Sequence, residues 1–277
     1  MKKTIIIFLI GLIAISSCNR MEEGGNEEAV AVKFTSSLIE TRVGGADGTI
    51  WDAGDPVGIY MIKATPGTLA AANILADNRR YLASAGTLTG FSAYSGAAIS
   101  YPLDGSDVKF LAYYPYSLAV TIDYLVPIDL SDQSNQSAID LLYAPITVSN
   151  YNKTTNVAVP LSFSHKLVKL VFDISNDVSV TEPVANGITV RIIGQQTVGA
   201  LDLTDGTVTP SGPVTNIITT STGTGTTVRA EAIVFPRSTS GFEFVFTNNK
   251  GQVFTIIDPH PLWVEGNIYT YTITLKE

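Results

Sequence analysis

The sequence predicts an all-β protein, and three observations support this prediction. Glycine occurs 23 times in 277 residues and only 15% of residues are charged, a composition that favours strands and turns over solvated helices. Apolar and polar residues alternate in many short runs, which is the pattern of half-buried strands. Clusters of Pro, Gly, Asp and Ser separate these runs. Many short strands with such punctuation predict sandwiches or barrels.

In the first half of the chain, one strand is predicted before residue 50 and the others after it. An earlier strand is expected in AVAVKF, where Val30, Val32 and Phe34 alternate with Ala, Lys and Thr. Further strands are expected at residues 57–63, 97–102, 108–116, 120–128 and 140–146. Residues 68–83 (TLAAANILADNRRYLA) are rich in alanine and favour a short helix, although their apolar positions are not cleanly periodic.

A polar gap, SNYNKTTN (149–156), precedes a second run of strands. In KLVKLVFDI (166–174), every second residue from Val168 onward is apolar, which predicts one buried face. The other expected strands are residues 187–194, 198–203, 228–235, 241–246, 252–257 and 267–275. TNNKG (247–251) predicts a hairpin loop, and TTSTGTGTT (219–227) predicts a mobile loop. We therefore expect two β-domains in tandem, residues 29–156 and 157–277.

The N-terminus has the pattern of an export signal. Lys2 and Lys3 precede a nearly unbroken apolar run, TIIIFLIGLIAI (4–15), and two serines follow it. The run is shorter than the roughly 20 residues that a membrane-spanning helix needs. We therefore expect residues 1–17 to be a signal peptide that is cleaved between Ser17 and Cys18.

Cys18 is the only cysteine of the chain, so it forms no internal disulfide, and thiolate metal sites need several cysteines. The segment Ile15–Cys18 (ISSC) resembles the bacterial lipobox, whose cysteine receives lipid and becomes the mature N-terminus. Acyl chains contribute about 0.8 kcal/mol per buried methylene and would hold the protein on a membrane. The alternative is an ordinary signal peptide with an incidental cysteine. Residues 18–28, polar and acidic, would form a flexible tether.

Charge and motifs narrow the function. Loss of the signal peptide would move the formal net charge from −8 to −10, which argues against nucleic acid as a partner. GxSxG, HExxH, P-loop and dinucleotide motifs are absent from the sequence. His165 has no evident catalytic partner and favours a structural role, while His260, between prolines, favours a loop. We expect a non-enzymatic protein without a cofactor. A hydrolase would need a polar cleft with perturbed carboxylates.

Two kinds of residue are candidates for binding. Carboxylates occur in turns, as in WDAGDP (51–56), but none has calcium-loop spacing, and Asp and Gly are common turn formers. We therefore expect no metal. The segment YYPY places Tyr113, Tyr114 and Tyr116 together, where they could contact a sugar or a partner protein. The alternative is a strand end whose alternate tyrosines are buried.

Six segments, in order, resemble the fimbrillin-like proteins of Bacteroidota. They are FTSSLIETR (34–42), IWDAGDPVGIY (50–60), VKFLAYYPY (108–116), DLLYA (140–144), VPLSFSHKLVKL (159–170) and LWVEGNIYTYTITL (262–275). The resemblance implies two transthyretin-like β-sandwich domains and a lipoprotein precursor exported to the cell surface and outer membrane. It also implies assembly into a fimbrium by strand exchange with other fimbrial subunits. The glutamates of the tether resemble the acidic signature for surface export in these bacteria.

In that family a trypsin-like protease cuts after an arginine near the start of the first domain, and Arg42 matches this position. The cut would release a leading segment, residues 29–42. Removal of an edge strand would leave unpaired backbone groups and vacated apolar pockets, the condition for accepting a donor strand. The alternative is that Arg42 is an ordinary solvated arginine.

The sequence leaves two roles open. The chain stops two residues after Leu275, whereas stalk subunits of the family are expected to carry a further C-terminal donor segment. This difference favours a tip or accessory subunit that binds host or bacterial surface ligands. The alternative is a permanently anchored surface lipoprotein that binds glycans or another ligand, in which Arg42 should resist cleavage.

Overall fold

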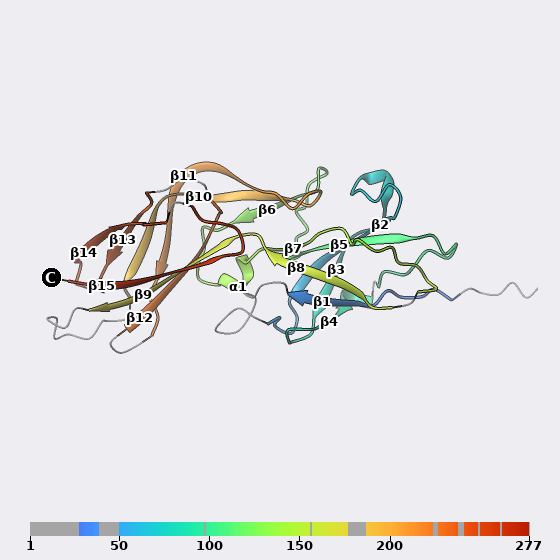
Figure 1. Ribbon diagram of the computed structural model, residues 1–277, viewed down its shortest axis with the longest axis horizontal. Coiled ribbons are helices and arrows are strands. Elements are labelled where there is room, and N and C mark those ends of the chain that lie inside the picture. Colours follow the sequence, from blue (N-terminus) through green and yellow to red (C-terminus); the bar gives the residue numbers. More distant parts are fainter. Residues whose placement is uncertain are drawn as a thin grey trace, which may run out of the picture.

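The computed structural model describes residues 28–38, 50–96, 98–155, 157–176, 187–223, 227–237, 241–248, 250–260 and 262–276. Strands form nearly all of its regular structure, which confirms the predicted all-β class. The molecule is elongated, with a barrel toward one end and a second group of sheets toward the other, where the C-terminal strand ends (Figure 1). Two tandem transthyretin-like sandwiches stay a prediction.

Within the described residues, seven strands close into a barrel in the order β1-β4-β3-β2-β5-β7-β8. They are β1 (Phe34–Leu38), β2 (Pro56–Lys63), β3 (Ile74–Ala83), β4 (Gly90–Ala93), β5 (Val108–Tyr114), β7 (Leu142–Ala144) and β8 (Val159–His165). Strand β1 closes the ring because it pairs with β4 on one side and, in parallel, with β8 on the other. A closed ring leaves no sheet edge open.

The second group consists of two sheets. One has the order β11-β10-β13-β14, and β6 pairs with β10 in addition; the other has the order β12-β9-β15. The strands are β6 (Leu125–Asp129), β9 (Val168–Asn176), β10 (Thr189–Asp202), β11 (Val208–Thr220), β12 (Thr227–Val234), β13 (Glu243–Thr247), β14 (Val253–Ile257) and β15 (Ile268–Leu275). In the described part of the chain, the helical elements are α1 (Gln136–Ile139) and two single 3₁₀ turns, η1 (Ala71–Asn73) and η2 (Tyr94–Gly96).

The sheets do not divide where the sequence suggests a domain boundary. Strand β8 follows residue 157 but belongs to the barrel, and β6 precedes it but pairs with β10 of the second group. The expected division between residues 156 and 157 therefore does not coincide with the hydrogen bonding of the sheets. The domain limits given above stay a prediction.

Two buried clusters match this arrangement. One fills the barrel around Phe34, Trp51 and Phe163. The other lies among the sheets of the second group and also takes in barrel residues such as Tyr60 and Tyr113. Burying a large apolar side chain contributes about 1.5–3 kcal/mol. Because one face of the barrel wall packs on this second cluster, the barrel and the sheets are joined by apolar contacts as well as by the chain.

The helix expected at residues 68–83 is wrong. The segment contains the single turn η1 and then the ten-residue strand β3, which pairs with β2 and β4. Ala76, Tyr81 and Ala83 are its buried residues. Pairing on both sides and burial within the barrel outweigh the weak helix propensity of the alanines.

Other strands differ in extent. Of the strand expected at 97–102, the described residues 98–102 form no strand; among them only Ser100 makes an isolated bridge, with Ala31. The two strands expected at 187–194 and 198–203 are one strand, β10, with register shifts against β11. Strand β11 was not predicted, and it includes Thr219 and Thr220 of the expected mobile loop. The hairpin at 247–251 is confirmed by the pairing of β13 with β14.

Candidate functional site

The first candidate site is the part of the barrel that surrounds the N-terminal strand. The Val32 amide donates to the Ile99 carbonyl (2.8 Å), and the Ser36 amide donates to the Thr89 carbonyl (2.9 Å). On the other side, the carbonyl of Lys33 accepts from the amide that begins β8 (2.8 Å). The segment 30–36 therefore has backbone partners on both sides, and the expectation of an edge strand is wrong.

Apolar side chains hold the same segment from within. Phe34 is 2% exposed and meets the rings of Tyr81 and Phe110 edge-on, with centroids 5.2 and 5.1 Å away. Val32 is also buried. Offset and edge-on ring pairs add about 0.5–1.5 kcal/mol to simple burial. The strand is thus held both by buried apolar side chains and by backbone hydrogen bonds. Its loss would leave a gap in the barrel between β4 and β8.

The residues at which we expect the chain to be cleaved or lipidated are not among those that the structure describes. Ser17 and Cys18, the signal cleavage and lipidation residues, and Arg42, the maturation residue, lie outside the described residues. The roles assigned to them stay predictions. The structure describes the strand that precedes Arg42 and the core that it enters.

The three tyrosines of YYPY differ in their surroundings. Tyr113 and Tyr114 are buried, and their hydroxyls donate to Asn78 Oδ1 (2.8 Å) and to the Ser137 carbonyl (2.8 Å). They cannot contact an external ligand in this structure, because β5 is buried on both faces. Tyr116 is half-buried, and the Arg80 guanidinium lies 5.6 Å from its ring centroid. Of the three, only Tyr116 is accessible to a partner.

The turn carboxylates accept hydrogen bonds from residues two or three positions away in the sequence. Asp55 Oδ2 accepts from the Asp52 amide (3.0 Å), and burial raises the pKa of Asp55 above its usual value of 3.8. In Asp104 and Asp205, by contrast, hydrogen bonds from the residue two positions later lower the pKa. The described residues contain no group of three or more His, Cys, Asp or Glu side chains that could hold a metal ion.

His165 has a partner that the sequence did not indicate. Its Nδ1 lies 3.0 Å from Asp140 Oδ1, and both side chains are buried. The next residue, Lys166, forms an ion pair with Glu265 (2.7 Å). The first contact ties the end of β8 to Asp140, just after α1, and the second ties Lys166 to the segment before β15. The buried contact of His165 agrees with the structural role expected for it.

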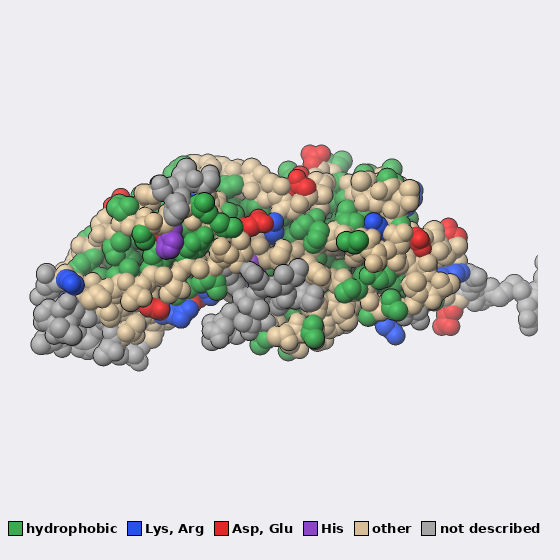
Figure 2. Space-filling view, in the orientation of Figure 1, with side chains coloured by type: hydrophobic (Ala, Val, Ile, Leu, Met, Phe, Trp, Pro, Cys, Tyr) green, Lys and Arg blue, Asp and Glu red, His purple; other side chains and the backbone are tan. Residues whose placement is uncertain are grey.

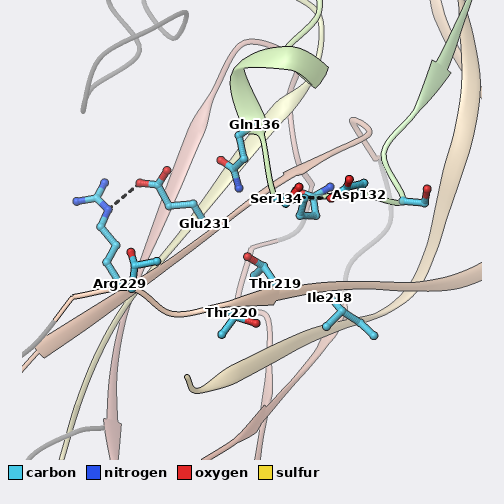
Figure 3. Close-up of a pocket in the computed structure, with 11 residues that line it drawn as sticks. Asp132, Ser134, Gln136, Ile218, Thr219, Thr220, Arg229 and Glu231 are labelled. Carbon is cyan, nitrogen blue, oxygen red and sulfur yellow. Dashed lines mark hydrogen bonds and ion pairs between the residues drawn. The ribbon is translucent and has the colours of Figure 1, made fainter. Parts of the chain in front are cut away.

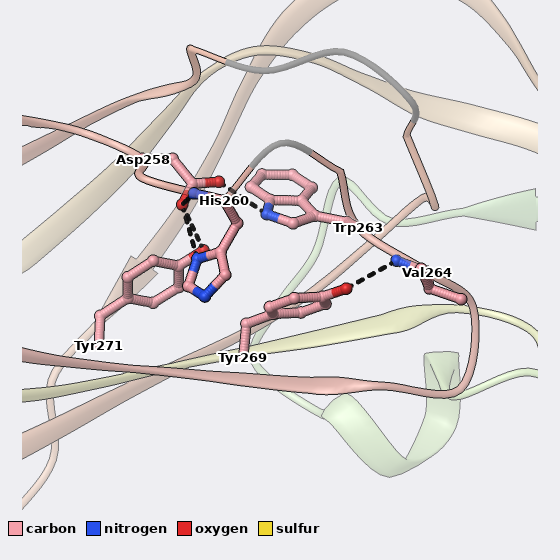
Figure 4. A network of polar contacts seen from close by, with 6 residues as sticks. All are labelled: Asp258, His260, Trp263, Val264, Tyr269 and Tyr271. Atoms are coloured by element: carbon pink, nitrogen blue, oxygen red, sulfur yellow. Dashed lines mark hydrogen bonds and ion pairs between the residues drawn. The ribbon is translucent and has the colours of Figure 1, made fainter.

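A second polar network fixes the segment between β14 and β15 (Figure 4). Asp258 is 4% exposed. Its carboxylate accepts from Trp263 Nε1 (2.8 Å) and the Tyr271 hydroxyl (3.0 Å), and His260 Nδ1 lies 3.0 Å away. Burial, together with the charge of Asp258, raises the pKa of Tyr271 far above its ordinary value. His260 lies in a loop, as the sequence predicted.

The surface supplies little further chemistry. Acidic and basic side chains are scattered over the face in Figure 2, without a large basic patch. No helix in the described part of the chain has the length and apolar character to cross a membrane.

Comparison with known proteins identifies the family. The family model described as "Fimbrillin-like" matches residues 41–277. The chain belongs to the fimbrillin-like family. A Bacteroides uniformis protein provisionally named fimbrium subunit Fim1C is 33% identical over 296 residues, covering 100% of this chain and 91% of that protein. This fimbrillin-like chain is therefore a member of a family of fimbrial and cell-adhesion subunits, as the six sequence segments indicated.

Solved structures agree with this assignment. A crystal structure of a Bacteroides uniformis protein, provisionally described as a cell adhesion protein, has a TM-score of 0.75 and 32% identity, covering 91% of this chain and 94% of that one. One from Bacteroides ovatus, similarly described, has a TM-score of 0.68 and 19% identity, with coverages of 90% and 93%. The second match shows the shared fold alone.

Proposed function

We propose that this fimbrillin-like protein is a non-enzymatic subunit of a surface fimbrium, assembled by exchange of its leading strand. In this proposal the chain is exported as a lipoprotein precursor, anchored to outer-membrane lipid through Cys18, and matured by cleavage after Arg42. Family membership and the N-terminal sequence pattern support it. A tip or accessory position, with host or bacterial surface ligands as partners, is part of the same proposal.

One observation carries the proposal: the N-terminal strand β1 completes the barrel between β4 and β8. Its covalent link to the next described residues runs through Arg42, so cleavage there would leave β1 held only by hydrogen bonds and by the burial of Val32 and Phe34. If β1 left, the facing backbone groups of β4 and β8 would lose their partners. An extended segment with alternating apolar residues would restore both interactions, which is β-augmentation.

The test begins with limited trypsin digestion of the full chain, analysed by intact mass and size-exclusion chromatography. We expect an early cut after Arg42 that leaves a folded body. A fluorescent synthetic peptide of residues 29–42 should then replace the released strand and comigrate with the body. A peptide carrying Phe34→Ala should bind much more weakly, because it lacks the main apolar anchor.

Two controls sharpen the result. The Arg42→Gln chain should keep its first strand and take up no peptide, whereas Arg20→Gln, in the tether, should behave as the wild type. If Arg42 resists trypsin, or if the cut body does not exchange its strand, exchange at β1 is wrong. Resistance at Arg42 is the result expected of the alternative, a permanently anchored surface lipoprotein.

A further inference from the structure

A polar cavity lies where the two sheets of the second group approach each other. Thr222, just after β11, exchanges backbone hydrogen bonds with Arg229 of β12 (2.8 and 3.0 Å). Continued in this antiparallel register, the next pairs would be Thr220 with Glu231 and Ile218 with Ile233. The strands part before these pairs form. The wedge between them is the cavity.

Gln133 keeps the wedge open. Its Oε1 accepts from the Ile233 amide (2.8 Å), while its Nε2 donates to the carbonyls of Ile233 (3.1 Å) and Leu130 (2.8 Å). The side chain thus takes the place that a strand neighbour would have on β12. Gln133 is buried, so these bonds fix the position of the whole loop before α1.

Backbone groups face the wedge from both sides. In an antiparallel strand, alternate residues direct their N–H and C=O groups to the same side. Arg229 and Ile233 bond away from β9, so the backbone groups of Glu231, between them, point the same way. By the same rule, the backbone groups of Thr220 point as those of Thr222 do. Each strand therefore offers a donor and an acceptor to whatever fills the wedge.

The cavity has a volume of about 640 Å³. Its lining residues are Ser131, Asp132, Gln133, Ser134, Gln136, Ile218, Thr219, Thr220, Thr222, Arg229 and Glu231. Gln136 projects from α1 on the side opposite Thr219 and Thr220 (Figure 3). Its Oε1 is buried and has no hydrogen-bond partner among the residues that the structure describes. A buried acceptor without a partner costs about 1–3 kcal/mol. Rotation of the amide about its terminal bond would turn Oε1 into the cavity, where a bound hydroxyl would donate to it.

The charged groups of the lining are paired with neighbours. Glu231 contacts Lys169 (2.7 Å) and Arg229 (2.8 Å), so its carboxylate is neutralised by cations. Asp132 accepts from the Ser134 amide (2.9 Å), and hydrogen bonds from Ser134 lower the pKa of its carboxyl. Asp132 is thus an ionised acceptor at neutral pH. The lining has two acidic groups, Asp132 and Glu231, and one basic group, Arg229, while Lys169 lies beside it. This combination does not favour a phosphate or another strongly charged anion.

The size of the wedge and the small number of open backbone groups in it favour a compact neutral ligand. On the side of β12 away from β9, Glu231 lies between Arg229 and Ile233, whose backbone groups on that side are already bonded. An extended peptide of several residues therefore cannot pair there. A sugar ring carries hydroxyls that donate and accept at once, and it matches a lining of amides, hydroxyls and carboxylates. The volume lies within the range of about 300–1,000 Å³ found for small-ligand sites.

We propose that this wedge binds a neutral carbohydrate of one or two sugar units. Gln136 and Asp132 accept from its hydroxyls on the side of α1. The Thr220 hydroxyl and the free backbone groups of Glu231 bind it from the strands. This site is independent of Arg42 and of strand exchange, so either proposal can fail without the other.

The test is saturation-transfer NMR on the full chain with glucose, galactose, mannose, N-acetylglucosamine and lactose, each at millimolar concentration. At least one sugar should receive saturation. Gln136→Ala and Thr220→Val should each weaken its binding about tenfold, the effect of losing one hydrogen bond of about 1.4 kcal/mol. Thr215→Val, on the exposed part of β11 outside the lining, should bind as the wild type does.

Tryptophan fluorescence would establish that each variant is folded. Absence of transfer to every sugar would overturn the proposal. So would a sugar that binds equally well to wild type, Gln136→Ala and Thr220→Val, because it would occupy another surface. Binding of an extended peptide that both variants abolish, without any sugar binding, would assign the wedge to a protein segment instead.

Discussion

The barrel and the second group of sheets differ in whether they have outer strands with unpaired backbone groups. In the described part of the barrel, β1 joins β4 to β8 and closes the ring. In the second group, β11 and β12 are outer strands of separate sheets. Among the described residues they pair only at Thr222 and Arg229, and beyond this pair they diverge. Closure makes the barrel depend on one short segment, whereas separation gives the second group a polar wedge. Fimbrial assembly and ligand binding can therefore belong to different parts of the chain.

The chain contains one reporter for each part. Trp51 is buried in the barrel and Trp263 in the second cluster. Trp51 meets Tyr114 and Phe163 edge-on, while Trp263 packs against Phe242, with centroids 4.2 Å apart. Chains with Trp51→Phe or Trp263→Phe would each keep a single fluorophore. Denaturation of these chains can compare the two parts directly.

The largest effect is expected from Phe34→Ala, which tests whether β1 controls the barrel. Removing a buried phenylalanine costs about 3–5 kcal/mol in unfolding free energy. In urea denaturation, the midpoint reported by Trp51 should fall much further than that reported by Trp263. Val245→Ala, on β13 of the other sheets, is a milder control. An equal fall at both tryptophans would show that the barrel and sheets unfold as one unit.

The next effect concerns Asp258, which serves the second group alone. Asp258→Ala would leave the buried donors of Trp263 and Tyr271 without their acceptor, at about 1–3 kcal/mol each. We expect a loss of about 2–5 kcal/mol, reported first by Trp263. Asp258→Asn keeps one acceptor and should cost less. If the alanine variant unfolded at the wild-type midpoint, the network in Figure 4 would have no structural weight.

A smaller effect is expected at the wedge itself. Gln133→Ala would leave the Ile233 amide and carbonyl without their partners, at a cost of about 1–3 kcal/mol. Hydrogen exchange at the Ile233 amide should accelerate strongly. Gln196→Ala, which removes an exposed bond to the Gly212 carbonyl, is the matched control and should change little. Unchanged protection at Ile233 would mean that another group holds the wedge open.

The sequence predicted those elements whose burial alternates. Strands β2, β5, β9 and β15 follow runs of alternating or continuous apolar residues, and their positions were predicted within a few residues. Strand β11 was not predicted, because nearly all of its residues from Val208 to Asn216 are exposed and include Pro and Gly. Backbone hydrogen bonds to β10, rather than buried side chains, hold this strand in place.

The site residues were harder to predict for a different reason. Gln133 and Ile233 are 100 positions apart and His165 and Asp140 are 25 apart, so no local pattern relates them. The tyrosines of YYPY were visible as a cluster, but which of them were accessible depended on tertiary packing: Tyr113 joins the second cluster and Tyr114 lies inside the barrel. The role of Phe34 was clear from sequence alternation, whereas its two-sided pairing with β4 and β8 was not.

The smallest effect is a difference in pH response between the two parts. Burial raises the pKa of Asp55, near Trp51, so the folded barrel binds this proton more tightly than the unfolded chain does. Its contribution to stability is therefore greatest below about pH 3.8 and falls as the pH rises through the raised pKa. Asp205, in the turn between β10 and β11, has a lowered pKa and contributes in the opposite direction, losing its effect as the pH falls.

Neutral substitutions separate the two responses. Asp55→Asn keeps an acceptor for the Asp52 amide but cannot ionise, so the Trp51 midpoint should rise relative to wild type at pH 7 and the difference should shrink toward pH 4. Asp205→Asn should lower the Trp263 midpoint at pH 7 and converge with wild type in acid. A Trp51 midpoint that changes with pH identically in wild type and Asp55→Asn would remove Asp55 as the source. If the same two variants shifted both tryptophans together, the coupling through the shared apolar cluster would outweigh the separation of the sheets.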